Sequence, residues 1–146
     1  MPLVWGNGLK GRSYGFDAWA DYQLTRWWRM GAGWSMLIER FHAKPSSSGL
    51  LGTSQLGDDP KQRASLRSSL TLAPTVSLDS ELRYVSKLPD PYVRHYVELD
   101  SRLAWRLDGR IDLAVAGSNL IHKRHVEYAG ADAVPRSVFV QLRWRP

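Results

Sequence analysis

The chain of 146 residues contains no cysteine, which excludes disulfide bonds, thiolate zinc sites and cysteine nucleophiles within it. No stretch approaches the ~20 consecutive apolar residues that a membrane-spanning helix requires. The first residues also lack the basic and apolar segments of a secretory signal peptide, because Gly6, Asn7 and Gly8 follow almost at once. If the protein is exported, we expect further residues before Met1.

A basic run is also missing, although the formal net charge is +6. The arginines are dispersed and alternate with Asp and Glu, and Lys123-Arg124 is the most prominent basic segment. This distribution argues against nucleic acid as a partner and leaves a basic β-sheet nucleic-acid binder as a third, weaker hypothesis. Hydrophobic residues make up 43% of the chain, which is typical of a folded protein rather than a disordered one.

Aromatic residues are abundant, with 7 Trp, 6 Tyr and 3 Phe. Rings with one polar end suit the boundary between lipid and water. A Trp-rich core or sugar-binding face explains the composition equally well, so composition alone leaves both interpretations open.

Apolar and polar residues alternate through the last third of the chain, over residues 97–107, 111–115 and 138–144. A period of two predicts strands with one apolar and one polar face, and here the polar face carries full charges in mid-strand. The same pattern predicts about seven strands in all. Their expected ranges are 13–24, 29–39, 65–72, 77–84, 92–107, 110–120 and 137–145.

Two kinds of connection alternate between these strands. Those near Arg26, Pro74 and Gly109 are tight, whereas those around 44–62, 89–91 and 122–135 are longer or irregular. An up-and-down meander with one trimmed end and one elaborated end is typical of outer-membrane barrels. The expected fold is therefore all-β, an antiparallel up-and-down meander of about seven long strands forming part of a transmembrane β-barrel.

A small soluble β-barrel or sandwich that binds an apolar ligand gives the same alternation and is the alternative. Three features favour the membrane. The strands reach about 10 residues, enough to cross a bilayer at a tilt. Aromatic residues lie near strand ends, and small residues such as Ala18, Ala20 and Gly117 occupy the apolar face, where a packed core would favour larger ones.

Candidate chemistry is sparse. His122 and His125 have i, i+3 spacing compatible with metal ligands, but without cysteine or a carboxylate cluster nearby a solvated loop is favoured. The rows of carboxylates and guanidinium groups on the polar face favour cross-strand ion pairs lining a lumen over a catalytic cleft. We therefore expect neither an enzyme nor a cofactor.

The chain resembles the C-terminal end of a TonB-dependent outer-membrane receptor. The residues that carry the resemblance are Tyr96–Trp105, the Gly-x-Asn-Leu element at Gly117–Leu120, and the alternating run after Pro135-Arg136 that ends in aromatic Trp144. Tyr14–Asp17 also looks like the start of an earlier strand in that family. The resemblance implies an iron–siderophore or similar receptor located in the cell outer membrane of a Gram-negative bacterium.

The family's barrel has 22 strands and a plug, so residues 1–146 are expected to be its C-terminal barrel portion, without the plug domain and the N-terminal strands. An open sheet in lipid leaves unpaired backbone groups at both edges, each costing several kcal/mol.

The resemblance also implies several partners. They are outer-membrane lipid, the remainder of the barrel and plug, the TonB complex reached through the missing N-terminal part, and the iron–siderophore ligand. External loops contact ligand in such receptors, and the candidate contact residues are Asp58, Asp59, Tyr92, His122, Arg124 and His125.

Overall fold

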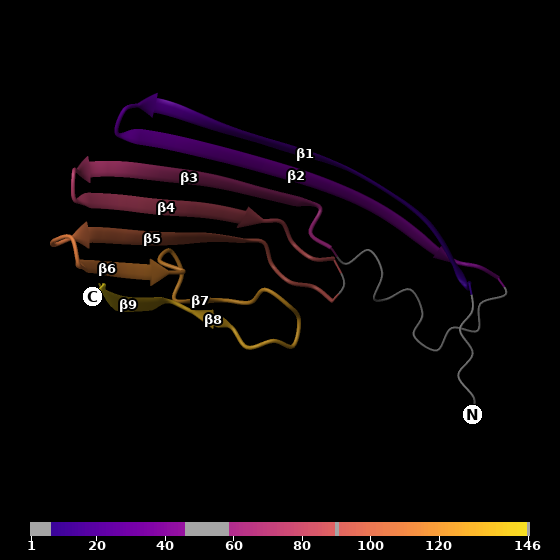
Figure 1. Ribbon diagram of the computed structural model, residues 1–146. Coiled ribbons are helices and arrows are strands. Elements are labelled where there is room, and N and C mark those ends of the chain that lie inside the picture. Colours follow the sequence, from indigo (N-terminus) through magenta and orange to yellow (C-terminus); the bar gives the residue numbers. More distant parts are fainter. Residues whose placement is uncertain (1–6, 46–58, 90, 146) are drawn as a thin grey trace.

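The computed structural model describes residues 7–45, 59–89 and 91–145 (Figure 1). One antiparallel sheet has seven strands in the order β1-β2-β3-β4-β5-β6-β9, so strands adjacent in sequence are adjacent in space. The bounds are β1 (Leu9–Thr25), β2 (Trp28–Ala43), β3 (Gln62–Ala73), β4 (Val76–Val85), β5 (Tyr96–Arg106), β6 (Ile111–Ser118) and β9 (Ser137–Trp144). The predicted all-β up-and-down meander is confirmed. No helix long and apolar enough to span a membrane occurs among the described residues.

Tight turns join β1 to β2, β3 to β4 and β5 to β6 at one end of the sheet, on the left of Figure 1. We name this the short-turn end and the opposite one the long-loop end. In the β5–β6 turn, Asp108 Oδ1 accepts hydrogen bonds from the backbone N–H groups of Arg110 and Ile111 at 2.7 and 2.8 Å. The predicted alternation between tight and long connections is therefore confirmed.

Several strand boundaries differ from those expected. The fifth strand begins at Tyr96 rather than Tyr92, because Pro89 and Pro91 cannot donate to a ladder and only an isolated Leu88–Val93 bridge forms there. The first two strands are longer than expected, since pairing continues outward to Leu9 and Ala43. The sixth ends at Ser118, two residues early, because the next residue leaves the extended conformation.

The connection between β6 and β9 contains a short hairpin that the sequence pattern did not predict. Its strands are β7 (Arg124–His125) and β8 (Val134–Pro135), which pair antiparallel over two residues each. Two residues are too few to show a periodicity of two, so no pattern was available to indicate it.

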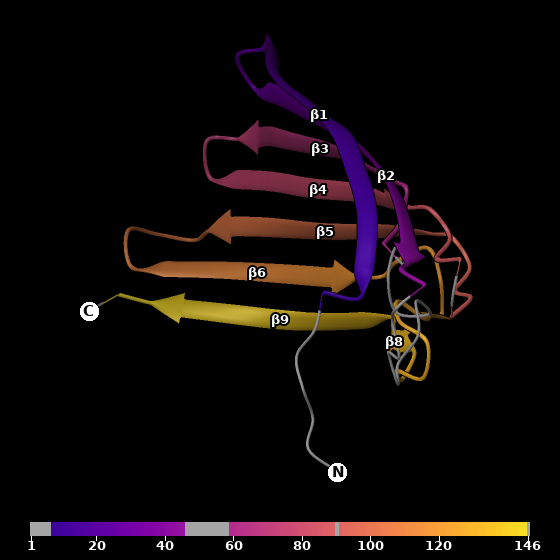
Figure 2. The same ribbon diagram turned by 90° about the vertical axis from the view of Figure 1, so that its right-hand side faces the viewer.

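The register gathers the apolar positions onto one face. One row across β3 to β9 consists of Leu70, Leu78, Leu103, Val115 and Val140, each paired with the next. The sheet is bent along its length, most visibly in β1 and β2 (Figure 2). The predicted two-faced strands are thus confirmed for this row by the register.

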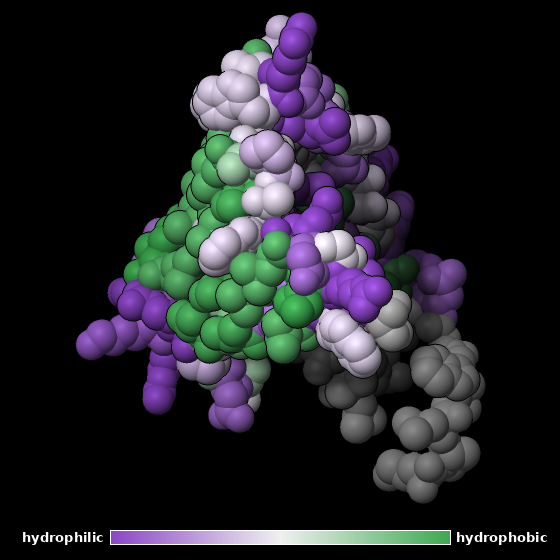
Figure 3. All heavy atoms as spheres, turned by 60° about the vertical axis from the view of Figure 1, so that its left-hand side comes forward, coloured by the Kyte–Doolittle hydropathy of each residue, from purple (hydrophilic) through white to green (hydrophobic). Residues whose placement is uncertain are grey.

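The sheet has almost no interior. Among the described residues the buried hydrophobic side chains are Val85, Val93 and Ala114. The accessible surface is 11599 Å², whereas a compact monomer of this mass exposes about 7,600 Å². Figure 3 shows the hydrophobic residues as one broad area bordered by hydrophilic ones. A soluble sandwich or barrel requires its apolar face to be covered by a second sheet or by closure of the barrel. Among the described residues neither covers the apolar face of this sheet.

Candidate functional site

The polar face carries ion pairs between neighbouring strands. Arg67 Nε lies 3.7 Å from Glu81 Oε1, and Arg106 Nε lies 3.6 Å from Asp112 Oδ1. Each pair consists of direct register partners on adjacent strands. The predicted cross-strand ion pairs are confirmed, and they make this face a charged wall.

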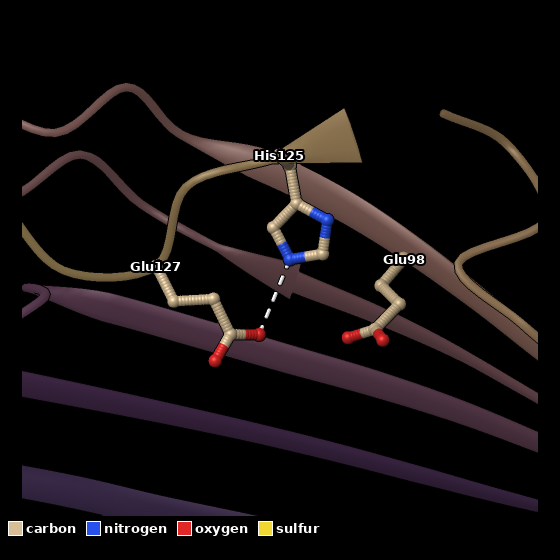
Figure 4. A group of neighbouring side chains, drawn as sticks. All are labelled: Glu98, His125 and Glu127. Atoms are coloured by element: carbon tan, nitrogen blue, oxygen red, sulfur yellow. Dashed lines mark hydrogen bonds and ion pairs between the residues drawn. The ribbon is translucent and has the colours of Figure 1, made fainter. Parts of the chain in front are cut away.

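A denser group of charges occupies the long-loop end of this wall, and we call it the charged cluster: Arg83 on β4, Glu98 on β5, His125 on β7 and Glu127 just beyond it. Arg83 Nη2 donates to Glu98 Oε2 and lies 3.4 Å from Glu127 Oε1. His125 Nε2 lies 3.2 Å from the same Glu127 oxygen (Figure 4). The Glu98 side chain is 8% exposed and that of His125 6%, whereas the Arg83 side chain is 48% exposed.

An aromatic contact adds to the charged cluster. The Tyr96 ring stacks on the His125 imidazole, with centroids 4.4 Å apart and planes at 26°. The loop between β6 and β9 is thereby held on the polar face by stacking as well as by charge. The cluster therefore fastens a long connection to the wall of the sheet.

The chain reaches this position through a sharp change of direction after β6. Asn119 is fully buried and has φ 53°, in the left-handed region that Asn adopts more readily than most residues. Its backbone N–H donates to Asp100 Oδ1 at 2.9 Å, and its Nδ2 donates to the Val134 carbonyl at 2.9 Å. Gly117 leaves room for Leu120, whose Cδ2 would lie 2.6 Å from an added Cβ. The Gly-x-Asn-Leu element thus directs the loop onto the wall.

The charged cluster also has the composition of a small cation site. One ligand atom each from Glu98, His125 and Glu127 lies within 4.8 Å of the others. The Arg83 guanidinium already supplies positive charge to both carboxylates, so a metal ion would have to displace it. The geometry accordingly favours a structural ion network over a metal centre. His122, the other half of the sequence-predicted metal pair, is exposed and lies outside this group.

The structure brings only one of the six candidate ligand-contact residues into the charged cluster, namely His125. Tyr92 is 63% exposed in the β4–β5 connection, and Asp59, His122 and Arg124 are exposed on other connections. Asp58 lies outside the described residues. A role of these residues in ligand contact stays a prediction.

Sequence reasoning missed Arg83, Glu98 and Glu127 as one group. Arg83 and Glu98 both occupy polar-face positions, but only the register makes them cross-strand partners. Glu127 lies in a loop without periodicity, so no sequence signal indicated its position.

The fold and these sites define a class: a wall section of a β-barrel with one apolar and one charged face. The siderophore receptor PiuA from Acinetobacter baumannii superimposes on 92% of this chain with a TM-score of 0.72 and 22% sequence identity. The structure of the FpvAI–pyocin S2 complex matches 93% of this chain with a TM-score of 0.71 and 18% identity. The chain spans only 22% and 19% of those two chains. No protein-family model and no curated protein sequence matches it.

The fold of the chain is thus that of a barrel segment in a siderophore receptor, about a fifth of such a receptor in length. The resemblance to the barrel of a TonB-dependent receptor, drawn above from sequence, is confirmed at the level of the fold.

Proposed function

We propose that the chain is the C-terminal part of the barrel of a TonB-dependent receptor in the outer membrane, which takes up an iron–siderophore complex or a similar nutrient. The observation that carries this proposal is the uncovered apolar face, backed by a charged face on the same strands. In water, exposed rows such as Val138, Val140 and Leu142, each at least 65% exposed, are an aggregation hazard. In a bilayer the same rows meet lipid and the charges line a wet lumen.

The two sheet edges support the same assignment. β1 and β9 each have a partner strand on one side only among the described residues. Unpaired backbone groups are too costly within hydrocarbon, so further strands are needed to close the barrel. The rest of the receptor barrel, a plug within it and the TonB complex are the partners that this proposal implies.

We propose that residues at the long-loop end contact the ligand. Asp59, Tyr92, His122 and Arg124 lie on connections at that end, and the charged cluster holds one of these connections against the lumen wall. Asp58, outside the described residues, is assigned to ligand contact with them. The protein binds and transports in this scheme and catalyses no reaction.

Single-cysteine labelling in the native outer membrane tests the orientation of the two faces, because the chain has no thiol of its own. Leu142 and Gln141 are neighbours on β9 with opposite orientation, and both are exposed. We expect Gln141→Cys to react with a water-soluble maleimide and Leu142→Cys to react only with a lipid-soluble one. Equal reactivity toward the water-soluble reagent, or recovery of the protein in the soluble fraction, contradicts the proposal.

Uptake is tested separately. Deletion of the gene in an iron-limited culture is expected to abolish accumulation of one radiolabelled ferric siderophore and to leave the others unchanged. Unchanged uptake across a panel of siderophores contradicts an iron–siderophore complex as the substrate. The labelling experiment then still tests whether the protein lies in the outer membrane.

A further inference from the structure

A group of basic side chains lies at the long-loop end of the β1–β2 hairpin. We call it the hairpin patch: Lys10 and Arg12 on β1, with Arg40 and His42 on β2. The register pairs Lys10 with His42 and Arg12 with Arg40, and all four are exposed. Together with Gly11 and Tyr14 they line an open groove of about 440 Å³.

Like charges face each other directly in this patch. Arg12 and Arg40 are cross-strand partners, an arrangement that destabilises a sheet unless an anion lies nearby. Within residues 7–45, 59–89 and 91–145, no carboxylate lies within 4.0 Å of the charged nitrogen atoms of Lys10, Arg12 or Arg40. Glu39, the nearest acidic residue on the hairpin, pairs with Ser13 and so belongs to the opposite face. Within the part of the chain that the structure describes, the positive charge of the patch is therefore not balanced by a neighbouring carboxylate.

The hairpin patch lies on the apolar face, immediately beyond the apolar stretch. On β1 this face runs from Tyr14 to Leu24, and on β2 from Trp28 to Ile38. Ten residue steps cover about 33 Å along a strand, or about 23 Å across the membrane at a tilt near 45°, which is close to the apolar band of about 25 Å. Arg12 and Arg40 are the next residues outward on this face. They lie at the height of lipid headgroups on the side of the long external loops.

We propose that the hairpin patch binds the phosphate groups of an outer-leaflet lipid whose headgroup carries more than one phosphate. The inference rests on the proposed function, because it requires the apolar face to contact lipid. Guanidinium groups bind phosphate oxygens in bidentate fashion, and the two arginines present such groups side by side. Three permanent cations match a headgroup with two phosphates better than one with a single phosphate. The position beside hydrocarbon selects a lipid rather than a free anion.

The test uses the complete protein in nanodiscs of phosphatidylcholine containing either diphosphorylated lipid A, its monophosphoryl form, or neither. The variant is Arg12→Gln/Arg40→Gln. The matched control, Arg102→Gln/Arg143→Gln, removes the same charge from two exposed arginines of the polar face. Native mass spectrometry counts retained lipids, and titration of lipid A gives the apparent affinity. Free pyrophosphate is added in a competition arm.

We expect the unchanged protein and the control to retain diphosphorylated lipid A in preference to the monophosphoryl form. The patch variant should lose about thirtyfold in affinity for lipid A. Each basic residue near a charged membrane surface contributes about 1 kcal/mol, and the variant removes two of them. Equal retention by the patch variant and the control overturns the inference, as does complete displacement by free pyrophosphate. Failure to insert into nanodiscs overturns the proposed function as well, whereas insertion without lipid selectivity overturns this inference alone.

Discussion

The charged cluster and the hairpin patch lie at the same end of one sheet, but only the cluster pairs its arginine with carboxylates of the same chain. Arg83 is surrounded by acceptors from its own chain, on Glu98 and Glu127. Arg12 faces Arg40 and has no carboxylate within 4.0 Å among the described residues. The first region satisfies its charges internally, because a loop folds back onto the wall. The second depends on its surroundings, and the same is true of the apolar face below it.

The largest expected effect concerns dependence on lipid. Ala20→Arg places a charge in the middle of the apolar stretch of β1, where it should destabilise the folded barrel by about 2–4 kcal/mol. Ser13→Arg, on the polar face of the same strand and opposite Glu39, should be nearly neutral. Urea unfolding of the protein in phospholipid vesicles, followed by tryptophan fluorescence, measures both. Equal stability of the two variants would contradict the assignment of one face to lipid and the other to water.

The next effect concerns the residue that turns the loop onto the wall. Asn119→Ala loses the bond to the Val134 carbonyl and puts alanine at φ 53°, so we expect a loss of about 2 kcal/mol. Asn119→Gly accepts the backbone angle and should lose only about half as much. If the two variants unfold at the same urea concentration, the left-handed backbone conformation at position 119 does not contribute to the difference in unfolding free energy.

A smaller effect is expected within the charged cluster. Glu98→Gln removes the buried negative charge that Arg83 contacts, and we expect a cost of about 1–2 kcal/mol, reduced because the Arg83 side chain is 48% exposed. Hydrogen exchange of the β7 amides should accelerate, since Glu98 no longer fixes the Arg83 guanidinium that contacts Glu127 of the loop. Unchanged exchange at His125 would show that stacking on Tyr96 holds the loop without the ion network.

The smallest effect provides the reference for that measurement. Arg67→Gln breaks the pair with Glu81, whose two side chains are 68% and 48% exposed. Water screens such a pair, so the change in unfolding free energy should stay below about 0.5 kcal/mol. A loss as large as that of Glu98→Gln would remove the distinction between the cluster and the rest of the wall.

Much of the fold was predictable because periodicity reports local geometry. The alternation over 97–107 and 138–144 predicted the faces of β5 and β9, and the turn residues near Arg26, Pro74 and Gly109 predicted the short-turn end. The boundaries at Leu9 and Ala43 were not predictable, because they depend on where a neighbouring strand continues to pair.

The sequence by itself determined that these strands have one apolar and one charged face, since side chains alternate on any extended chain. Only the tertiary structure decided which charges meet. Arg83 and Glu98 are fifteen residues apart and become neighbours through register, and Glu127 joins them through a loop that Asn119 redirects. The same register sets Arg12 against Arg40 and leaves both facing outward. Pairing between strands is a long-range property, and a pattern with a period of two fixes the face of each side chain but does not distinguish registers that differ by two residues.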